Sequence, residues 1–366
     1  MDTIRAAVVD AYDGVFRIQD VHLDGPRHHE VLVEVRAVGL CHSDLHVAEG
    51  NIPFPLPIVL GHEVSGVVIE TGPHVTTLSP GDHVVGSLLQ TCRACRACRE
   101  GRSYQCENPD ATLRAAGDRP RLSRDGVALS QGYGLGAFAE RIVAHQNQLS
   151  KVPDNLPFPQ AALLGCGVAT GVGAVVNTAS VHPGDTVVVI GAGGVGLSVV
   201  AGARLAGAAR IVVIDLQPRK LELALTFGAT DAINPSEVDA EAAVLAATGG
   251  GADHVFEAIG LKSTSEQAVR MARRGGAAYL IGLHKPGAKI EIDALRDLIR
   301  GQKRIQGVYM GSSDIERDIP LYADYYLQGR LDLDDLISGE IRLDQINEAY
   351  DELKKGSVTR SIITSF

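Results

Sequence analysis

Residues 186–215 constrain the fold more than any other part of the sequence. An apolar run, TVVVI, occupies residues 186–190, and a second apolar run, residues 211–214, ends at Asp215. Between them, residues 195–206 have the length and composition of a helix. The turn that opens this helix fits the pattern G-x-G-x-x-G and contains Gly191, Gly193, Gly194, Val195 and Gly196. This order predicts a strand–turn–helix–strand unit that binds a dinucleotide.

The chemistry of that unit favours NAD. Glycines permit a tight turn and let a pyrophosphate approach the N-terminus of a helix closely. Asp215 lies where an acidic residue hydrogen-bonds the adenosine ribose, and its charge would repel the 2′-phosphate of NADP. Lys220 is a further candidate for contact with the ribose. The alternative is that the glycines serve only helix packing and that Asp215 only caps a strand.

Two domains are expected because 366 residues exceed one compact core. Strands and helices alternate after residue 183, which predicts parallel βαβ units, whereas short β-rich runs dominate the first part of the chain. We therefore predict an α/β protein with a ligand cleft between two domains. One is mostly β and spans residues 1–167 and 307–366; the other has a doubly wound parallel sheet and spans residues 168–306.

Two further segments carry specific expectations. Residues 305–310 are a candidate edge strand of the parallel sheet, through which subunits could join. Residues 107–136 are rich in Arg, Gly and Ser, and they are predicted to form an irregular surface loop beside the active site or a subunit contact.

Composition and charge exclude several functions. The formal net charge is −10, and no basic stripe with interleaved aromatic residues is present, so nucleic acid is not an expected partner. The N-terminal sequence has no basic segment followed by an apolar run, and no stretch of about 18 consecutive apolar residues occurs. We expect no membrane association and a cytoplasmic location.

Four of the six cysteines lie within residues 92–106. Cys92, Cys95, Cys98 and Cys106 can surround a tetrahedral ion, and four thiolates leave no position open for chemistry, which predicts a structural zinc site. An iron–sulfur cluster is the main alternative, but the long gap before Cys106 and the absence of a second cluster motif count against it. Unmetallated thiols, or a zinc ribbon that binds nucleic acid, would also produce a cysteine cluster.

The remaining cysteines, Cys41 and Cys166, lie far apart in the sequence, and Gly61-His62-Glu63 lies between them. Two thiolates and one imidazole would leave one position of a zinc ion open for water or substrate, which is typical of a catalytic site. Taken singly, each would be an ordinary core residue. Together they predict a second zinc ion with a catalytic role.

These features together resemble the zinc-containing medium-chain alcohol dehydrogenases over nearly the whole chain. The glycine-rich turn with Asp215, both cysteine groups, the His62 segment and the terminal Thr359-Arg360-Ser361 occur in the family's order and at similar spacing. The resemblance implies a GroES-like catalytic domain and a Rossmann NAD-binding domain. It also implies two zinc ions per chain, hydride transfer between an alcohol or aldehyde and NAD, and a homodimer or homotetramer.

The resemblance also implies roles around the catalytic zinc. Cys41, His62 and Cys166 would bind the ion, Glu63 would be a nearby or transient ligand, and Asp44 would orient His62 through its second ring nitrogen.

Further roles follow from the same resemblance. Ser43 matches a hydroxyl residue that accepts the substrate proton, and His46 matches a histidine that passes it through the cofactor ribose to water. His42 and Arg360 match positions that contact the pyrophosphate. A histidine at position 42 provides less fixed positive charge than the arginine found in other family members.

The sequence leaves more than one substrate class open. Ser43 is smaller than Thr, and Leu88 is smaller than the Phe of some relatives, which favours a bulky, aryl or allylic primary or secondary alcohol, although neutral variation explains both equally well. A thiol-dependent formaldehyde dehydrogenase, using a mycothiol or glutathione adduct, is the alternative within the family; residues 49–53 are short of the acidic side chains that recognise the glutathione amine. A non-enzymatic dinucleotide-binding or lens-type structural protein is the alternative outside it, and such proteins typically lack the zinc ligands.

Overall fold

The computed structural model describes residues 2–356 and 358–366, which form two compact units. The chain returns from the second unit to the first at Ser313, later than the predicted residue 307, and one short segment of the C-terminal part belongs to the second unit. The first unit comprises Met1–Gly167, Ser313–Gly329 and Leu333–Phe366, and the second comprises Val168–Ser312 and Arg330–Asp332.

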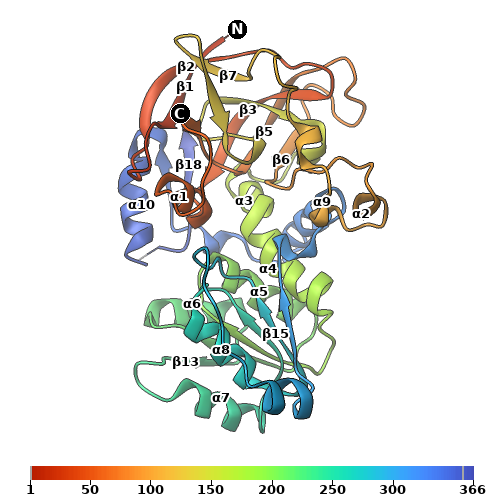
Figure 1. The fold of residues 1–366 in the computed structure, drawn as a ribbon, viewed down its shortest axis with the longest axis vertical. Helices are drawn as coiled ribbons and strands as arrows, with labels where there is room; N and C mark the ends of the chain where they lie inside the picture. Colours follow the sequence, from red (N-terminus) through yellow and green to blue (C-terminus); the bar gives the residue numbers. More distant parts are fainter. Residues whose placement is uncertain (1, 357) are drawn as a thin grey trace. The chain divides into compact units, whose positions relative to one another are not determined.

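The first unit is built on two β-sheets (Figure 1). Its strands are β1 (Asp2–Val9), β2 (Arg17–Leu23), β3 (Glu30–Gly39), β4 (Ile58–Val59), β5 (Glu63–Thr71), β6 (His83–Gly86), β7 (Leu122–Arg124), β8 (Val127–Gln131), β9 (Arg141–His145), β10 (Leu149–Lys151), β17 (Gly339–Arg342) and β18 (Ser361–Ser365). One sheet closes into a barrel in the order β1-β2-β7-β8-β4. The other has the order β10-β6-β5-β3-β18-β17, and β9 also pairs with β3.

Helices of the first unit pack around these sheets. They are α1 (His42–Ala48), α2 (Arg96–Arg99), α3 (Phe158–Leu163), α9 (Ile315–Leu327) and α10 (Ile346–Lys354). The C-terminal α10 is fixed to the core by Tyr350, whose ring stacks on Phe16 at a centroid distance of 4.9 Å. Phe138 meets Phe16 edge-on at 5.7 Å, an arrangement that aromatic quadrupoles favour. This aromatic group therefore joins the two ends of the first unit's sequence.

The second unit is a doubly wound parallel sheet, as the sequence predicted. Its strands are β11 (Thr186–Ile190), β12 (Arg210–Ile214), β13 (Asp231–Ile233), β14 (Ala252–Glu257), β15 (Ala272–Leu280) and β16 (Arg304–Gly307), and its helices are α4 (Ala169–Gly173), α5 (Gly194–Leu205), α6 (Pro218–Phe227), α7 (Ala240–Thr248) and α8 (Lys262–Met271). The strand order β13-β12-β11-β14-β15-β16 is that of a Rossmann fold. The central strands are apolar on both faces because helices cover both faces of such a sheet. The strand β16, at one edge of this sheet, overlaps the predicted edge strand 305–310 only over residues 305–307, because residues 310–312 form a 3-10 turn.

The segment 107–136 is only in part the irregular surface loop that the sequence predicted. It contains β7 and β8 of the barrel, and Arg121 within it is only 6% exposed. The Arg121 guanidinium lies 2.7 Å from Glu30, and Arg114 forms ion pairs with Glu30 at 2.6 Å and Asp24 at 2.7 Å. Two arginines of the segment thus fasten it to the barrel through Glu30 and Asp24, whereas residues 107–111 and 115–119 are exposed.

A helical stretch over residues 158–179 is not evident from the sequence pattern. It is long and apolar enough to cross a membrane by length and composition alone, but 83% of its most apolar window is buried inside the protein, as in a core helix. Its glycines disfavour a helix in isolation. The structure explains two of them: a Cβ on Gly165 would lie 2.3 Å from Gly86 O, and one on Gly171 would lie 2.4 Å from the Ser198 side chain. Close packing therefore requires glycine here.

Candidate metal and coenzyme sites

A buried group of ligand-type side chains forms in the first unit from three separate segments. Cys41 immediately precedes α1, His62 and Glu63 lie at the start of β5, and Cys166 lies in a π-helical turn, residues 164–168. One ligand atom from each of the four lies within 4.8 Å of the others. None of these side chains is more than 6% exposed. Single π-helical turns often mark functional sites, and this one carries Cys166 into the group.

Asp44 fixes the orientation of the His62 ring. The Nδ1 atom of His62 lies 3.0 Å from Asp44 Oδ1, and the same oxygen accepts a hydrogen bond from the Gly61 amide at 3.0 Å. With Nδ1–H donating to the carboxylate, Nε2 carries the lone pair. That Nε2 atom is buried and has no hydrogen-bond partner. A buried nitrogen lone pair without a donor is well suited to a metal ion and costly otherwise.

Glu63 and Arg360 form an ion pair behind the group. Arg360 Nη2 lies 3.0 Å from Glu63 Oε1, and Nη1 donates to the carbonyl oxygen of Leu40 at 3.0 Å. Two glycines make room for this pair: a Cβ on Gly167 would lie 3.0 Å from Arg360 Nη2, and one on Gly39 would lie 2.4 Å from Glu63 Oε2. The structure thus assigns Arg360 a partner that the sequence did not predict.

The ionisable groups perturb one another strongly. Burial raises the pKa of Glu63 to about 7, and burial also raises the pKa of Asp44. Burial disfavours the charged form of His62, but the Asp44 and Cys41 charges outweigh this effect and raise its pKa well above the ordinary value. A hydrogen bond between the two thiols lowers the pKa of Cys41 and raises that of Cys166.

The donor set fits a divalent cation. Two thiols, an unpartnered imidazole nitrogen and a carboxylate converge, and Arg360 pairs with the carboxylate. Sulfur and imidazole ligands are the ones that zinc prefers. The group therefore has the ligand types that a bound zinc ion needs.

The short helix α1 carries the other residues predicted around this group. Ser43 Oγ lies 3.5 Å from Cys41 Sγ. Its side chain and that of His46 are three residues apart and share one helix face. Both are half-buried, and His46 Nδ1 lies 3.4 Å from Asn51 Nδ2. His42 begins the helix and is exposed.

An aromatic pair that the sequence did not reveal lies against His62. The ring of Tyr133 meets the His62 ring edge-on at a centroid distance of 4.9 Å, and Phe54 packs on Tyr133 at 5.2 Å. Tyr133 has φ +55°, a left-handed conformation that costs free energy for a non-glycine residue. No local pattern marked these residues, because they come from two loops that only the fold brings to His62.

The four remaining cysteines form a second group in the first unit. The sulfur atoms of Cys92, Cys95, Cys98 and Cys106 lie within 4.8 Å of one another, and no disulfide links them. Backbone amides point at the sulfurs: Cys95 N lies 3.3 Å from Cys92 Sγ, and Cys92 N lies 3.2 Å from Cys106 Sγ. Such N–H···S bonds stabilise thiolates, and those from Cys98 and Glu107 lower the pKa of Cys95 to about 6. This group is less buried than the first, and it consists of cysteines alone.

The glycine-rich turn in the second unit has the geometry of a coenzyme site. It follows β11 and opens α5, with Gly193 at the N-cap. A Cβ on Gly196 would lie 1.8 Å from Gly191 O, so the turn closes only with glycine there, whereas a Cβ on Gly193 would meet nothing within 4 Å. Open space over exposed backbone at a helix N-terminus accommodates a pyrophosphate.

Asp215 directly follows β12 and hydrogen-bonds this turn through its carboxylate. Its Oδ2 accepts a hydrogen bond from Ala192 N at 2.8 Å, and its Oδ1 accepts one from Gln217 N at 2.9 Å. Each carboxylate oxygen has a further acceptor position, so the ribose contact predicted from the sequence is chemically available. Lys220 lies on α6 and is half-buried.

Comparisons with known proteins agree with these two kinds of site. Residues 27–154 match the family model for the alcohol dehydrogenase GroES-like domain, and residues 194–324 match that for zinc-binding dehydrogenases. The chain is 37% identical to an S-(hydroxymethyl)glutathione dehydrogenase of Escherichia coli over 98% of its length and 99% of that protein. It is 37% identical to a geraniol dehydrogenase of Castellaniella defragrans, covering 98% and 97% of the two chains. The crystal structure of benzyl alcohol dehydrogenase from Acinetobacter calcoaceticus is 34% identical and superimposes with a TM-score of 0.94, covering 100% of both chains.

Proposed function

Because the chain belongs to the zinc-containing medium-chain alcohol dehydrogenase family, we propose that it is an NAD-dependent dehydrogenase of bulky aryl or allylic alcohols. The observation that carries the catalytic part is the buried group of Cys41, His62 and Cys166 with its unpartnered imidazole nitrogen. We assign catalysis to the first unit and coenzyme binding to the second.

Cys41, His62 and Cys166 would hold the catalytic zinc, and the four cysteines of residues 92–106 would hold a structural one. Bound zinc acts as a Lewis acid, which favours loss of the alcohol proton and polarises the aldehyde carbonyl in the reverse direction. Asp44 keeps His62 in the ligating tautomer. Glu63 is ion-paired with Arg360, so we assign it the role of a nearby carboxylate that could bind the ion transiently.

The proton leaves through α1. Ser43 lies beside the ligand Cys41, where its hydroxyl can accept the proton of a bound alcohol and donate its own to the next group. His46 lies one helical turn further and is half-buried, so it can pass the proton towards solvent. Imidazole is the side chain best suited in general to exchange protons at neutral pH.

The turn of residues 191–196 would hold the pyrophosphate of NAD, with His42 and Arg360 as the further contacts. NAD, when bound, accepts hydride from the alcohol carbon. Asp215 would bind the ribose hydroxyls and disfavour NADP by charge repulsion, and Lys220 would be available to the same ribose. The subunits form a homodimer or a homotetramer through the edge strand β16.

The aromatic pair beside His62 supports the substrate class. Tyr133 contacts a zinc ligand directly and Phe54 extends the apolar surface behind it. A flat, conjugated alcohol gains dispersion and edge-to-face contacts on such a surface that a short aliphatic alcohol does not. Leu88, 8% exposed, leaves more room than a phenylalanine would.

A thiol adduct of formaldehyde is the second candidate, because the chain is similar to an S-(hydroxymethyl)glutathione dehydrogenase. Recognition of the glutathione ammonium group would need a free carboxylate. Glu49, in the loop after α1, is paired with Lys354 at 2.9 Å, so a glutathione ammonium group would have to compete with this lysine. This contact favours the aryl or allylic alcohol.

The decisive assay follows NADH formation with benzyl, allylic, aliphatic and secondary alcohols, and separately with formaldehyde in the presence and absence of glutathione or mycothiol. The proposal expects benzyl and allylic alcohols to have the highest kcat/KM. Formaldehyde oxidation that requires a thiol and exceeds benzyl alcohol oxidation would overturn it.

A pair of variants isolates the aromatic contact. Tyr133→Ala should lower kcat/KM for benzyl alcohol by about tenfold relative to propan-1-ol, whereas Tyr133→Phe should leave the ratio nearly unchanged because the ring is kept. An equal loss for both alcohols in Tyr133→Ala would mean that Tyr133 supports the site without selecting the substrate.

A further inference from the structure

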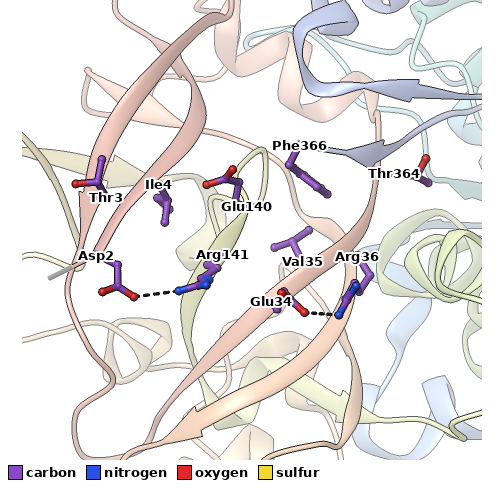
Figure 2. Close-up of a pocket in the computed structure, with 10 residues that line it drawn as sticks. All are labelled: Asp2, Thr3, Ile4, Glu34, Val35, Arg36, Glu140, Arg141, Thr364 and Phe366. Carbon is purple, nitrogen blue, oxygen red and sulfur yellow. Dashed lines mark hydrogen bonds and ion pairs between the residues drawn. The ribbon is translucent and has the colours of Figure 1, made fainter.

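Two surface cavities lie apart from the sites above, one in each unit. The first, of about 720 Å³, is lined by parts of β1, β3, β9 and β18 (Figure 2). Its lining side chains carry three carboxylates and two guanidinium groups. Asp2 pairs with Arg141 at 3.0 Å and Glu34 pairs with Arg36, and Figure 2 shows both contacts as dashed lines. The carboxylate of Glu140 accepts a hydrogen bond from the Arg5 amide at 2.9 Å. Both guanidinium groups of this cavity are therefore already paired with carboxylates, and no cation among its described lining residues remains to bind an anionic ligand.

The second cavity, of about 660 Å³, lies at the opposite edge of the parallel sheet from the coenzyme turn. It is lined by the end of α8, the beginning of β15, part of α7 and the segment that leads into β16. These are the amino ends of the strands, whereas residues 191–196 follow the carboxyl end of β11. Because the strands are parallel, the two ends lie on opposite edges of the sheet. A ligand here would not compete with the coenzyme.

Cationic side chains dominate the second cavity, although the chain as a whole carries a net charge of −10. The cations outnumber the carboxylates five to two. The cationic residues are Arg270, Arg274, Arg296, Arg300 and Lys303, and the acidic ones are Glu241 and Asp297.

The carboxylates neutralise only part of this charge. Glu241 pairs with Arg270 at 2.7 Å. Asp297, 2% exposed, pairs with Arg296 at 2.8 Å and with Lys303 at 3.2 Å. The two acidic groups are thus fixed on three of the cations.

Arg274 and Arg300 are the remaining cations. Neither has a carboxylate partner among residues 2–356 and 358–366. The segments that carry them are held side by side, because the Gly275 amide donates to Gly301 O at 2.8 Å. Two unpaired guanidinium groups on adjacent backbone segments, lining one cavity, repel each other unless an anion lies between them.

We propose that this cavity binds a small organic phosphate, with its phosphate group held by Arg274 and Arg300. Planar guanidinium groups match phosphate oxygens with paired N–H donors, and two of them balance a dianion. Gln302, which also lines the cavity, offers an amide donor. Leu245 and Ile299 supply apolar surface on which the organic part can pack, and the volume lies in the range of small-molecule sites.

Calorimetric titration with inorganic phosphate and with n-butyl phosphate tests this site on the intact enzyme. Excess NAD is present throughout, so that the coenzyme turn is occupied, and sodium chloride holds the ionic strength constant within each titration. Butyl phosphate should bind more tightly than inorganic phosphate. Both affinities should fall as salt is raised, because exposed charges are screened. No binding of either probe would overturn the proposal. Equal affinities for the two probes would overturn the claim that the cavity also binds the organic group.

Matched variants locate the binding. Arg274→Gln combined with Arg300→Gln should lower the affinity for butyl phosphate by at least about tenfold, because two charge-assisted contacts are lost. The control, Arg5→Gln combined with Lys289→Gln, removes the same charge from exposed positions outside the cavity and should bind as the parent does. All three proteins should oxidise alcohol at similar rates, which shows that they are folded. Equal weakening in both double variants would assign the effect to net charge and refute the site.

Discussion

Replacing Asp44 by asparagine tests how the protein prepares His62 for zinc. In the parent, one carboxylate oxygen of Asp44 lies 3.0 Å from His62 Nδ1 and accepts the Gly61 amide at 3.0 Å, and the side chain is fully buried. The carbonyl oxygen of the new side chain can keep both hydrogen bonds. Its amide nitrogen then takes the place of Oδ2, which also lies 3.0 Å from Nδ1, and there two donors face each other.

The expected magnitude follows from these contacts. A hydrogen bond to a charged group contributes about 1.5–3 kcal/mol, and a neutral one contributes about 0.5–1.5 kcal/mol. The difference of about 1–2 kcal/mol corresponds to a loss of about 5- to 30-fold in zinc affinity at the first site. The general effect of altering a partner of a zinc-bound histidine has the same order.

Competition against a chelator of known affinity measures this loss. The four-cysteine site provides an internal control, because its zinc should be retained equally in parent and variant. Asp82→Asn provides a second control, since it removes the same charge from a surface ion pair with Lys151. If Asp44→Asn binds the first zinc as tightly as the parent, or if both zinc ions weaken together, the proposed role of Asp44 is wrong.

Three further changes have defined outcomes. Asp215→Asn should lower the NAD-to-NADP ratio of kcat/KM by about tenfold, because it removes the charge that repels the 2′-phosphate; steady-state kinetics with both coenzymes decide this. Arg121→Met should lower the free energy of unfolding by about 1.5–3 kcal/mol in urea titrations, since it removes a charge-assisted hydrogen bond to the buried Glu30 carboxylate, to which Arg114 remains paired. Burial and a neighbouring arginine lower the pKa of His145 from 6.5 to about 4. Between these pH values the unfolded chain binds a proton at His145 and the folded protein does not, so the free energy of unfolding falls as the pH drops through this range. His145→Gln should make the decline in urea midpoint from about pH 7 to about pH 5 shallower, and an unchanged slope would contradict this assignment.

The sequence alone predicts those sites whose residues lie close together in the chain. The turn after β11 is recognisable because residues 191–196 combine a tight turn, glycines that let a pyrophosphate approach the backbone, and the start of a helix. The four-cysteine group is recognisable for the same reason. Cys41, His62 and Cys166 are recognisable only as a set, and the structure brings their ligand atoms together.

The parts that sequence could not predict depend on contacts between distant segments. Tyr133 reaches His62 only because the barrel brings its loop there, and no spacing rule encodes that contact. Arg121 lies in a segment whose composition indicates solvent exposure, and its buried partner Glu30 lies far away in the chain. The helix over residues 158–179 escapes sequence patterns because glycines weaken a helix in isolation, whereas here close packing requires them.

Metal analysis coupled to an activity assay tests the central claim most directly. The account predicts about two zinc ions per chain and NADH formation that depends on benzyl alcohol. Cys41→Ser should retain about one zinc ion, keep its thermal stability and lose turnover, whereas Cys98→Ser should chiefly lose stability. Turnover by a zinc-free protein, or equal loss of stability in the two variants, would contradict the division into a catalytic and a structural site.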